Sequence, residues 1–419
     1  MSRVDNLTVA PGSPDVMKAV LKSGRNKENN VIVPSSALTI REIQEKIPVK
    51  YFERNTTRSV MFLLRDLAQV ALTYAIMYAV ALPLATSMEV SAARTVADGG
   101  ALSLMAGTAM TTAAWLLKGV LWAVFWFVQG LNGTALWVLA HECGHQAFSP
   151  MKGLNDAVGM ILHSALLVPY HSWRITHGGH HKHTNHLTKD LVFVPEKRNS
   201  VVELVEDAPL VSLIQTLIIF LFGWPAHLLF NASGQEFGRL ACHFDPGAPF
   251  FRSEDRHDVV LSNVGIVSAL FVIFSSVYRF GFTNVFYWYI VPYLWVNFWL
   301  VYITYLQHTD IRIPHYTHEH WTFVRGALAA VDRDYGFVLN TWLHHIKIPT
   351  PSHQDSHVVH HLFSKMPHYN AIQVTRKYIR EILGATYITD ERSLWKMLWE
   401  QRKECRYVVP AEGVCVFHG

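Results

Sequence analysis

The stretch VLWAVFWFVQGLNGTALWVLAHECGH, residues 120–145, joins a long apolar run directly to a pair of histidines. Residues 120–140 carry no charged side chain, and the run is about as long as the roughly 20 residues that a membrane-spanning helix needs. His141 and His145 follow four positions apart, so a helix that continues through them places both rings on one face. This spacing by itself does not specify a metal site, and the rest of the chain must decide its meaning.

The overall composition is that of a membrane protein. Half of the 419 residues are hydrophobic and only 16% are charged, which is unusual for a soluble globular chain. Six stretches are uncharged, or nearly so, and long enough to form a spanning helix. They are Leu67–Met88, Gly99–Leu117, Gly119–His141, Leu210–Gln235, Val259–Tyr278 and Phe280–Thr309.

Two of these six stretches are not expected to cross the membrane as straight helices. Residues 99–115, GGALSLMAGTAMTTAAW, are rich in small residues and only weakly hydrophobic, so we predict a hairpin or re-entrant piece there. In GWPAHLLF, Pro225 interrupts the apolar run, which favours a kinked or half-buried segment. The remaining stretches predict an all-α integral membrane protein with about four transmembrane helices.

Polar segments lie on both sides of the apolar region. Residues 1–57 form a polar arm without the apolar core of a secretory signal, so we expect the first span to direct insertion. Within this arm, Thr39 is followed by Glu42 and then Pro48, a pattern that predicts a short capped helix. Beyond Asp310, AIQVTRKYIREIL and RSLWKMLWEQRK are amphipathic and predict helices that lie on a membrane face or close over a site.

Charge and cysteine content exclude some classes of function. The net charge of +4 is mild, and no long Lys/Arg run is present, so we predict basic cytoplasmic flanks and no nucleic-acid surface. No CxxC pair occurs, which argues against a disulfide framework and against a thiolate metal site. The four cysteines are Cys143, Cys242, Cys405 and Cys415.

Three histidine clusters lie just outside the apolar runs. The first is HECGH, with His141 and His145; the second and third, HGGHH and HVVHH, share the HxxHH spacing. That spacing puts all three rings of each box on one face of a helix. The second and third boxes supply His177, His180, His181, His357, His360 and His361.

Metal coordination explains the three boxes better than a structural role does. Isolated histidines such as His163, His171 and His227 are expected to be hydrogen-bonded structural residues. Eight box histidines close to a membrane are different, because unpaired ring nitrogens are costly there and a metal satisfies them together. Imidazole suits zinc, copper, iron or nickel, and a zinc site is complete with four ligands. Eight ligands therefore imply two metal ions and require all boxes to lie on one side of the membrane.

Several blocks of sequence resemble a known family. They are WVLAHECGHQAFS, LHSALLVPYHSWRITH, HHKHTNHLTKDLVFVP, GWPAHLLFNASG, ACHFDPGAPF, DRDYGF and HVVHHLFSKMPHYNA. Together these blocks resemble the membrane-bound fatty acyl desaturases of the delta-12 and omega-3 branch. The resemblance extends from about Thr39 to Thr386.

The resemblance implies both a fold and an activity. It implies four spanning helices with a cytosolic, histidine-rich, metal-binding cap, and a non-haem di-iron centre that uses dioxygen as co-substrate. Electrons would come from cytochrome b5 and its reductase, and a double bond would be inserted into a lipid-linked acyl chain in the endoplasmic reticulum. The implied organisation is a polar cytosolic N-terminal arm (1–57), a membrane desaturase domain with its cap (58–386) and a C-terminal cytosolic tail (387–419).

The resemblance also adds a ninth ligand. In QHTD, His308 ends the last apolar run, where related membrane desaturases carry an additional histidine ligand. The predicted metal ligands are then His141, His145, His177, His180, His181, His308, His357, His360 and His361. His183 and His186 are expected to be second-shell or surface residues, and no catalytic residue beyond the ligands is predicted.

Other functions remain open at this stage. Gly178 and Gly179 stand where the family usually has a polar or basic residue, and glycine costs about 1 kcal/mol relative to alanine in a helix, so this helix is expected to be irregular or closely packed. The IKIPTPSHQDS lead into the third box also departs from the branch. An acetylenase, conjugase or hydroxylase of the same family is therefore an alternative, and a membrane metal transporter is the non-enzymatic one.

Overall fold

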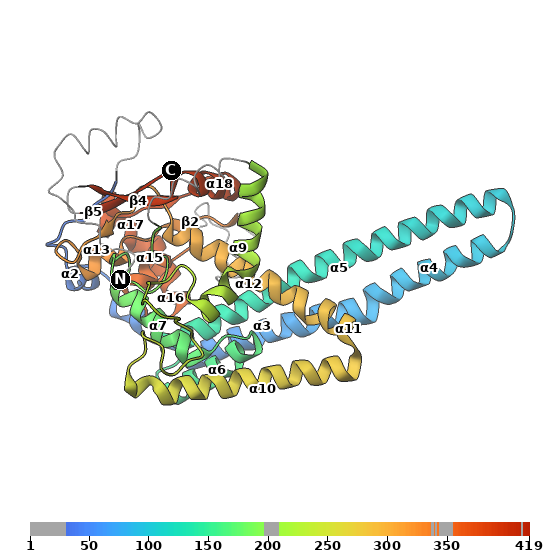
Figure 1. The fold of residues 1–419 in the computed structure, drawn as a ribbon, viewed down its shortest axis with the longest axis horizontal. Helices are drawn as coiled ribbons and strands as arrows, with labels where there is room; N and C mark the ends of the chain where they lie inside the picture. The colour runs from blue at the N-terminus through green and yellow to red at the C-terminus, as the bar shows by residue number, and fades with distance from the viewer. Residues whose placement is uncertain (1–30, 197–208, 337–338, 340–341, 343–354, 412–413) are drawn as a thin grey trace.

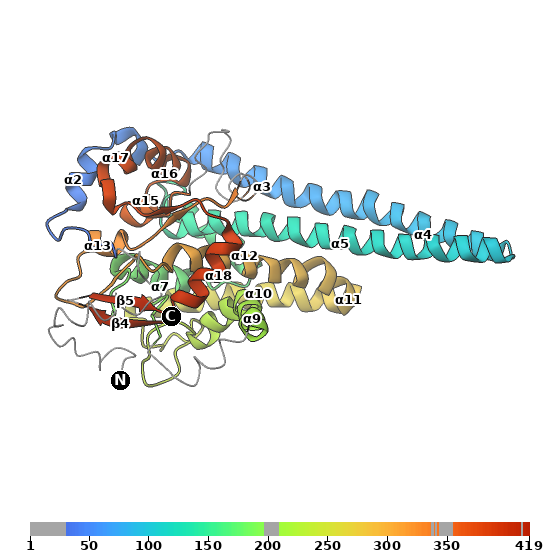
Figure 2. The same ribbon diagram turned by 90° about the horizontal axis from the view of Figure 1, so that it is seen from above.

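The computed structural model describes residues 31–419 except 197–208, 337–338, 340–341, 343–354 and 412–413. Most of these residues are helical, and the helices form two regions (Figures 1 and 2). Long helices extend away on one side, and short helices and strands form a cap on the other. Residues 1–30 of the polar arm and most of the lead into the third histidine box lie outside the described residues.

The first two apolar helices form a long antiparallel hairpin. The first is continuous from Thr56 to Ala97, and its parts are α3 (Thr56–Ile76), the π-helical turn η2 (Met77–Ala81) and α4 (Leu82–Ala97). The second is α5 (Ala101–Gly144). Both exceed the roughly 20 residues that a bilayer requires, and the tip of the hairpin projects beyond the other helices (Figure 1).

The prediction of a hairpin or re-entrant piece within residues 99–117 is wrong. Residues 101–117 are the first part of the uninterrupted helix α5. Small side chains at the contact allow α4 and α5 to approach closely, as is common between transmembrane helices. A Cβ atom on Gly107 would lie 2.3 Å from Val96 Cγ2 and 2.9 Å from the Val96 backbone nitrogen. Gly107 and Ala114 are the buried residues of this stretch, so small residues here mark a helix–helix contact and not a break in the helix.

The remaining apolar helices differ in direction. Helix α10 (Arg256–Phe280) runs alongside the hairpin and is joined through Gly281 to a second continuous helix. The parts of that helix are α11 (Phe282–Val285), the π-helical turn η4 (Phe286–Ile290) and α12 (Val291–His308). Helix α9 (Pro209–Phe230), which contains Pro225, instead packs against α12 and runs in a different direction from α10 and the hairpin (Figure 1). Five helices are long and apolar enough to span a membrane, but α9 does not share the direction of the others.

The cap is built on the helices that carry the second and third boxes. The predicted short helix is confirmed as α2 (Ile40–Glu45), with the capping box between Thr39 and Glu42. The other cap helices are α6 (Lys152–Ala165), α7 (Tyr170–His183), α13 (Phe323–Ala327), α15 (His357–Leu362), α16 (His368–Val374), the π-helical turn η5 (Thr375–Ile379) and α17 (Arg380–Leu383). Short 3-10 turns are η1 (Val49–Phe52), η3 (Ser253–Asp255) and η6 (Gly384–Thr386).

The cap also contains two small sheets, so the fold is mainly helical rather than all-α. One sheet has the order β1-β5-β4 and is antiparallel, and the other pairs β2 with β3 in parallel. The strands are β1 (His315–Tyr316), β2 (Asp332–Arg333), β3 (Thr389–Asp390), β4 (Tyr407–Ala411) and β5 (Val414–His418).

The C-terminal residues, predicted as a tail, pack into the body of the protein. Helix α18 (Leu394–Glu404) buries Met397 and Leu398 against α9 and α12. Strand β5 is the central strand of its sheet, and its residues share a core with Tyr316 of β1. The amphipathic pattern of residues 392–403 is thus confirmed as a helix with one face buried.

The contact at Gly107 gives a test of the hairpin. Gly107→Ala forces α4 and α5 apart, and overpacking of this kind costs about 1–3 kcal/mol. We expect this variant to have a lower thermal unfolding midpoint in detergent, measured by tryptophan fluorescence. Gly119→Ala is the matched control, because a Cβ on Gly119 of the same helix meets nothing within 4 Å and alanine is favoured there by about 1 kcal/mol. Equal midpoints for the two variants would contradict the close packing.

Candidate metal centre

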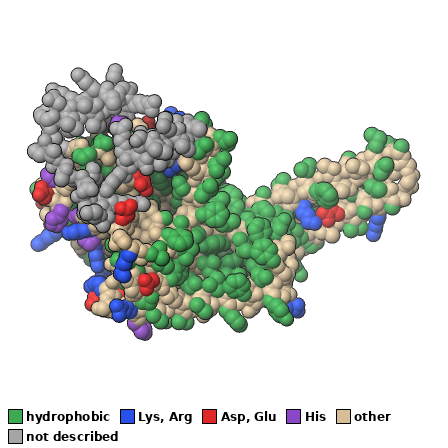
Figure 3. Space-filling model, in the orientation of Figure 1, with side chains coloured by type: hydrophobic (Ala, Val, Ile, Leu, Met, Phe, Trp, Pro, Cys, Tyr) green, Lys and Arg blue, Asp and Glu red, His purple; other side chains and the backbone are tan. Residues whose placement is uncertain are grey.

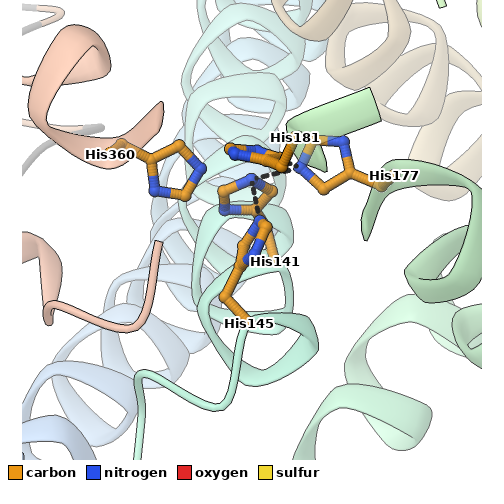
Figure 4. Close-up of side chains that lie close together, drawn as sticks. All are labelled: His141, His145, His177, His181 and His360. Atoms are coloured by element: carbon orange, nitrogen blue, oxygen red, sulfur yellow. Dashed lines mark hydrogen bonds between the residues drawn. The ribbon is translucent and has the colours of Figure 1, made fainter. Parts of the chain in front are cut away.

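The nine predicted ligand histidines converge at one place, where the ends of α5, α7, α12 and α15 meet. One group contains His141, His145, His177, His181 and His360, whose ring nitrogens lie within 4.8 Å of one another (Figure 4). A second group contains His180, His308 and His361 within the same distance. The ninth, His357, lies against the second group, with its Nε2 2.8 Å from His308 Nε2.

Each box is helical, as its spacing predicts. His141 is in the last turn of α5 and His145 is the C-cap residue, so both point from one face. Helix α7 continues through both glycines of the second box and ends at His183. The expected irregularity or tight packing is absent at Gly178, where a Cβ would meet nothing within 4 Å, whereas at Gly179 it would lie 3.1 Å from Leu191 Cδ1. Steric space does not explain the glycine at position 178.

Hydrogen bonds between the rings cannot satisfy the first group. His141 Nε2 lies 2.9 Å from His177 Nε2 and 3.3 Å from His145 Nε2. His177 Nε2 also lies 3.1 Å from His181 Nε2. A neutral ring nitrogen has either one hydrogen or one lone pair, so an Nε2 atom that faces two others can be paired with only one. The same conflict occurs at His357 Nε2, which faces both His308 and His361.

A metal ion in each group resolves this conflict. Imidazole nitrogens bind a metal such as zinc at about 2.0–2.1 Å, so two ligands at right angles lie roughly 3 Å apart. The observed contacts of 2.8–3.3 Å have this spacing. All nine lone pairs can then point inward together. The donor set therefore fits two metal ions held mainly by histidine.

Two contacts fix which ring nitrogen faces the centre. Asp190 Oδ1 lies 2.7 Å from His180 Nδ1, and both side chains are buried. Thr184 donates its hydroxyl hydrogen to the His180 carbonyl, so its oxygen accepts from His361 Nδ1 at 3.1 Å. In both rings Nδ1 carries the hydrogen and Nε2 is left for a metal. Such outer partners orient ligands and raise their basicity.

Buried carboxylates hold the third box in place. Asp355 Oδ1 accepts from the His357 backbone N–H, and Asp332 Oδ1 accepts from the next one, on Val358. Tyr387 donates to Asp332 Oδ2 at 2.6 Å, and Gln307 of α12 donates to Asp355 Oδ2 at the same distance. Burial, together with the neighbouring Asp355 carboxyl, raises the pKa of Asp332. The two carboxyl groups thereby cap α15 and tie it to α12.

A further carboxylate links the first box to the chain beyond the third. Glu142, between the two histidines of HECGH, is buried and accepts from the His368 backbone N–H at 2.9 Å. This bond fixes the start of α16 against the end of α5. Sequence reasoning did not identify Glu142, Asp190, Asp332, Asp355 or Thr184. Four of them lie close to the boxes in the sequence, and Asp332 lies in the DRDYGF block. Neither signal shows which atom each residue contacts.

Among the described residues, the other histidines singled out from the sequence lie outside the two groups. His183 Nδ1 contacts the Gly179 carbonyl oxygen, and His186 Nε2 lies 3.5 Å from His318 Nδ1. His163 is fully buried among Trp137, Trp173 and Tyr170, and burial lowers its pKa to about 3. His227 packs against His243. None of them is part of the metal-binding arrangement.

An apolar cavity of about 110 Å³ ends at the histidines. Its walls come from α5 and α12, with Trp137, Val138, Leu300 and Ile303 among the lining residues. Polar residues also line it, including Thr134, Thr304 and Gln307, together with His141, His177, His308, His357 and His360. The cavity therefore brings apolar walls and both histidine groups to the same space.

Comparison with known proteins shows the family of this chain. The family model described as "Fatty acid desaturase" matches residues 115–391. The chain belongs to the fatty acid desaturase family. It is 41% identical over 408 residues to a "Delta(12) fatty acid desaturase" of Mortierella alpina, with 93% of this chain and 92% of the relative covered.

Plant relatives are similar over nearly the same length. A "Delta(12)-acyl-lipid-desaturase" of Punica granatum is 40% identical, with 91% of this chain and 90% of the relative covered. An "Omega-6 fatty acid desaturase, endoplasmic reticulum isozyme 2" of Glycine max is 38% identical, with 96% of each chain covered. The predicted family is thus confirmed, and the protein is an oxidoreductase that acts on fatty acyl chains.

The contact between Asp190 and His180 gives a test of the metal site. In the wild type, Asp190 Oδ1 contacts His180 Nδ1, and Oδ2 accepts a hydrogen bond from the Asn185 N–H. The amide of Asp190→Asn has only one oxygen, and its nitrogen cannot accept a hydrogen bond. It therefore cannot serve both groups, and the support of His180 is lost. We expect metal affinity to fall about 10–100-fold, measured as metal retained after dialysis against a chelator. Asp245→Asn is the control, because Asp245 is exposed and bonds only a local turn. Equal retention by both variants would show that Asp190 does not support a ligand.

The buried rings also predict a pH dependence. Burial, with the neighbouring histidines, holds the pKa of His177, His181, His357 and His361 well below the ordinary value. In the unfolded chain these residues gain protons near pH 6.5, so acidification favours the unfolded state. We expect the unfolding midpoint of metal-free protein to fall steadily from about pH 7 to pH 5. A constant midpoint over this range would mean that the rings are not buried in the neutral form.

Proposed function

We propose that this chain is a di-iron acyl-lipid desaturase that inserts a double bond of the delta-12 type into a membrane lipid. The observation that carries the proposal is the apolar cavity that ends at both histidine groups. The names of the relatives, with delta-12 and acyl-lipid activities, support the regiochemistry and the lipid-linked substrate. We propose iron because imidazole suits it and because the chemistry requires a redox-active metal.

The proposed reaction removes two hydrogens from adjacent methylene groups. Overall, CH2–CH2 with O2, two electrons and two protons gives CH=CH and two molecules of water. The two iron ions would supply the oxidising power, with electrons from cytochrome b5. The nine histidines would hold them, and Asp190, Thr184, Asp332 and Asp355 would keep those ligands oriented.

The cavity walls position the substrate. Trp137 and Val138 of α5 and Leu300 and Ile303 of α12 offer carbon surfaces to an acyl chain. Such walls exclude water from the reacting carbons and orient a chain that has no polar group of its own. The methylene groups of an acyl chain are chemically alike. The position of the new double bond would then depend on how far along the cavity the chain is held.

The proposed topology has four spanning helices and the histidine groups on the cytosolic face. The continuous helices of residues 56–97, 101–144, 256–280 and 282–308 supply the four spans. Helix α9 would lie at the membrane surface beside the cap, since it does not share the direction of the four spans (Figure 1) and leaves apolar side chains such as Leu213, Leu217 and Phe222 exposed. We propose the endoplasmic reticulum as the location, as named for the Glycine max relative.

Expression in a yeast host tests the activity directly. We expect cells with the wild-type chain to accumulate a new diunsaturated acyl chain, identified by gas chromatography with mass spectrometry. His180→Ala should abolish this product, because it removes a ligand together with its bond to Asp190. His257→Ala should leave the product unchanged, since that side chain is 88% exposed. A hydroxylated or triple-bonded product would instead identify the alternative enzymes, and absence of any new acyl species would refute the proposal.

A further inference from the structure

A second, larger groove lies on the membrane face of the protein, away from the histidines. It has a volume of about 910 Å³ and is bounded by α3, α6, α10 and η4. Its walls are mostly carbon, with Tyr74, Ala269, Val272 and Trp288 among them. Apolar side chains cover this face between α10 and the start of the last spanning helix (Figure 3). The size is within the roughly 300–1,000 Å³ of small-molecule sites.

The groove follows the distal half of α10. The lining residues on this helix extend from Gly265 to Phe280, which is roughly 22 Å at about 1.5 Å per residue. The full distance between the charged ends of the helix, Arg256 and Arg279, is roughly 35 Å by the same rise, close to the ~30 Å hydrocarbon thickness of a bilayer. The groove therefore runs along the direction of lipid tails and extends over more than the roughly 15 Å depth of one leaflet.

The inner end of the groove is closed by a helix contact. A Cβ on Gly265 would lie 2.3 Å from Ser164 Oγ and 2.5 Å from Met160 Cε, so α6 touches α10 there. Ser164 is buried, and its hydroxyl has no hydrogen-bond partner among the described residues. On the other side of this turn of α6, His163 packs against Trp137, which lines the catalytic cavity. The groove and the cavity at the histidines are thus separate spaces.

The outer end of the groove carries a positive charge. Arg279 lies with its guanidinium 5.7 Å from the ring centre of Phe280, which lines the groove. In the part of the chain that the structure describes, it forms no ion pair with a carboxylate. Arg279 stands at the end of α10 where the lipid headgroups are expected, and its guanidinium can bind the phosphate of a lipid headgroup.

We propose that this groove binds an acyl chain of a glycerophospholipid from the leaflet distal to the histidine groups, with Arg279 at its phosphate. This lipid is not the substrate whose acyl chain is oxidised. The groove is therefore a second lipid site, in addition to the site of the proposed reaction. The bound chain fills the space between α3 and α10 and supports α6, which separates the groove from the catalytic cavity. A soluble ligand does not fit this arrangement, because the groove opens towards the hydrocarbon of the bilayer.

Native mass spectrometry of the purified protein tests the proposal. We expect the wild-type chain to retain a phospholipid through repeated detergent washes, seen as a mass shift and identified by fragmentation. Ala269→Trp fills the groove and should abolish this shift. Val272→Trp repeats the test at a side chain that is 62% exposed, where a large residue is compatible with folding. Val267→Trp is the matched control, because Val267 is 64% exposed on the same helix but does not line the groove.

The outcomes separate this proposal from the others. Loss of the lipid in both groove variants, but not in the control, supports it. Equal retention in all variants, no retention by the wild type, or a retained sterol or detergent overturns it. A wild-type dimer that the groove variants dissociate would assign the groove to a second copy of the chain. Lipid retention needs neither metal nor turnover, so failure here leaves the proposed desaturation unaffected.

Discussion

Ring nitrogens that are buried between α5, α7, α12 and α15 need partners, and the rest of the structure depends on how this need is met. Nine imidazoles converge there, and several Nε2 atoms face two others at about hydrogen-bond distance. Hydrogen bonding alone leaves some of these contacts unsatisfied, which is costly in a buried site. Metal coordination satisfies them together and requires the rings to be neutral. Burial keeps them neutral, because it lowers the pKa of His177, His181, His357 and His361.

This requirement determines the polar residues around the centre. Asp190 and Thr184 occupy the outer ring nitrogens of His180 and His361, while Asp332 and Asp355 bond the first N–H groups of α15. Glu142 bonds the start of α16. The bonds of Asp332, Glu142 and Thr184 join segments that are distant in the chain. Asp190 orients a ring within its box, and Asp355 caps α15 locally. Hydrogen bonds directed at the predicted ligands and at the helices that carry them therefore organise the cap, and its apolar clusters fill the space behind them.

The membrane helices impose a different constraint. Without water between them, helices associate through close packing, so small residues at contacts are favourable. Gly107 against Val96, Gly133 against Val296 and Gly265 against Ser164 are such contacts. They let the α5–α12 pair enclose the cavity at the histidines, while α3, α6 and α10 diverge further out and leave the larger groove. The cavity at the histidines and the larger groove thereby lie on different faces of the same bundle.

The sequence alone determined the membrane class, the capped helix at Thr39 and the eight box histidines, because each is encoded in local spacing and composition. The family and the ninth histidine, His308, came from the resemblance of longer blocks of sequence. The i, i+3, i+4 pattern defines a helix face wherever the helix lies, and the third box needed no tertiary information to be recognised. The prediction that residues 99–117 interrupt the helix was wrong. Small residues such as Gly107, which packs against α4, have low hydrophobicity and resemble a break in the sequence pattern. Only the tertiary structure decided that His357 joins His308, that Asp190 supports His180, that α9 runs in a different direction from α10 and the hairpin and that β5 pairs with β1. These are contacts between segments far apart in the chain, or the choice of one atom among several neighbours, and periodicity carries no information about either.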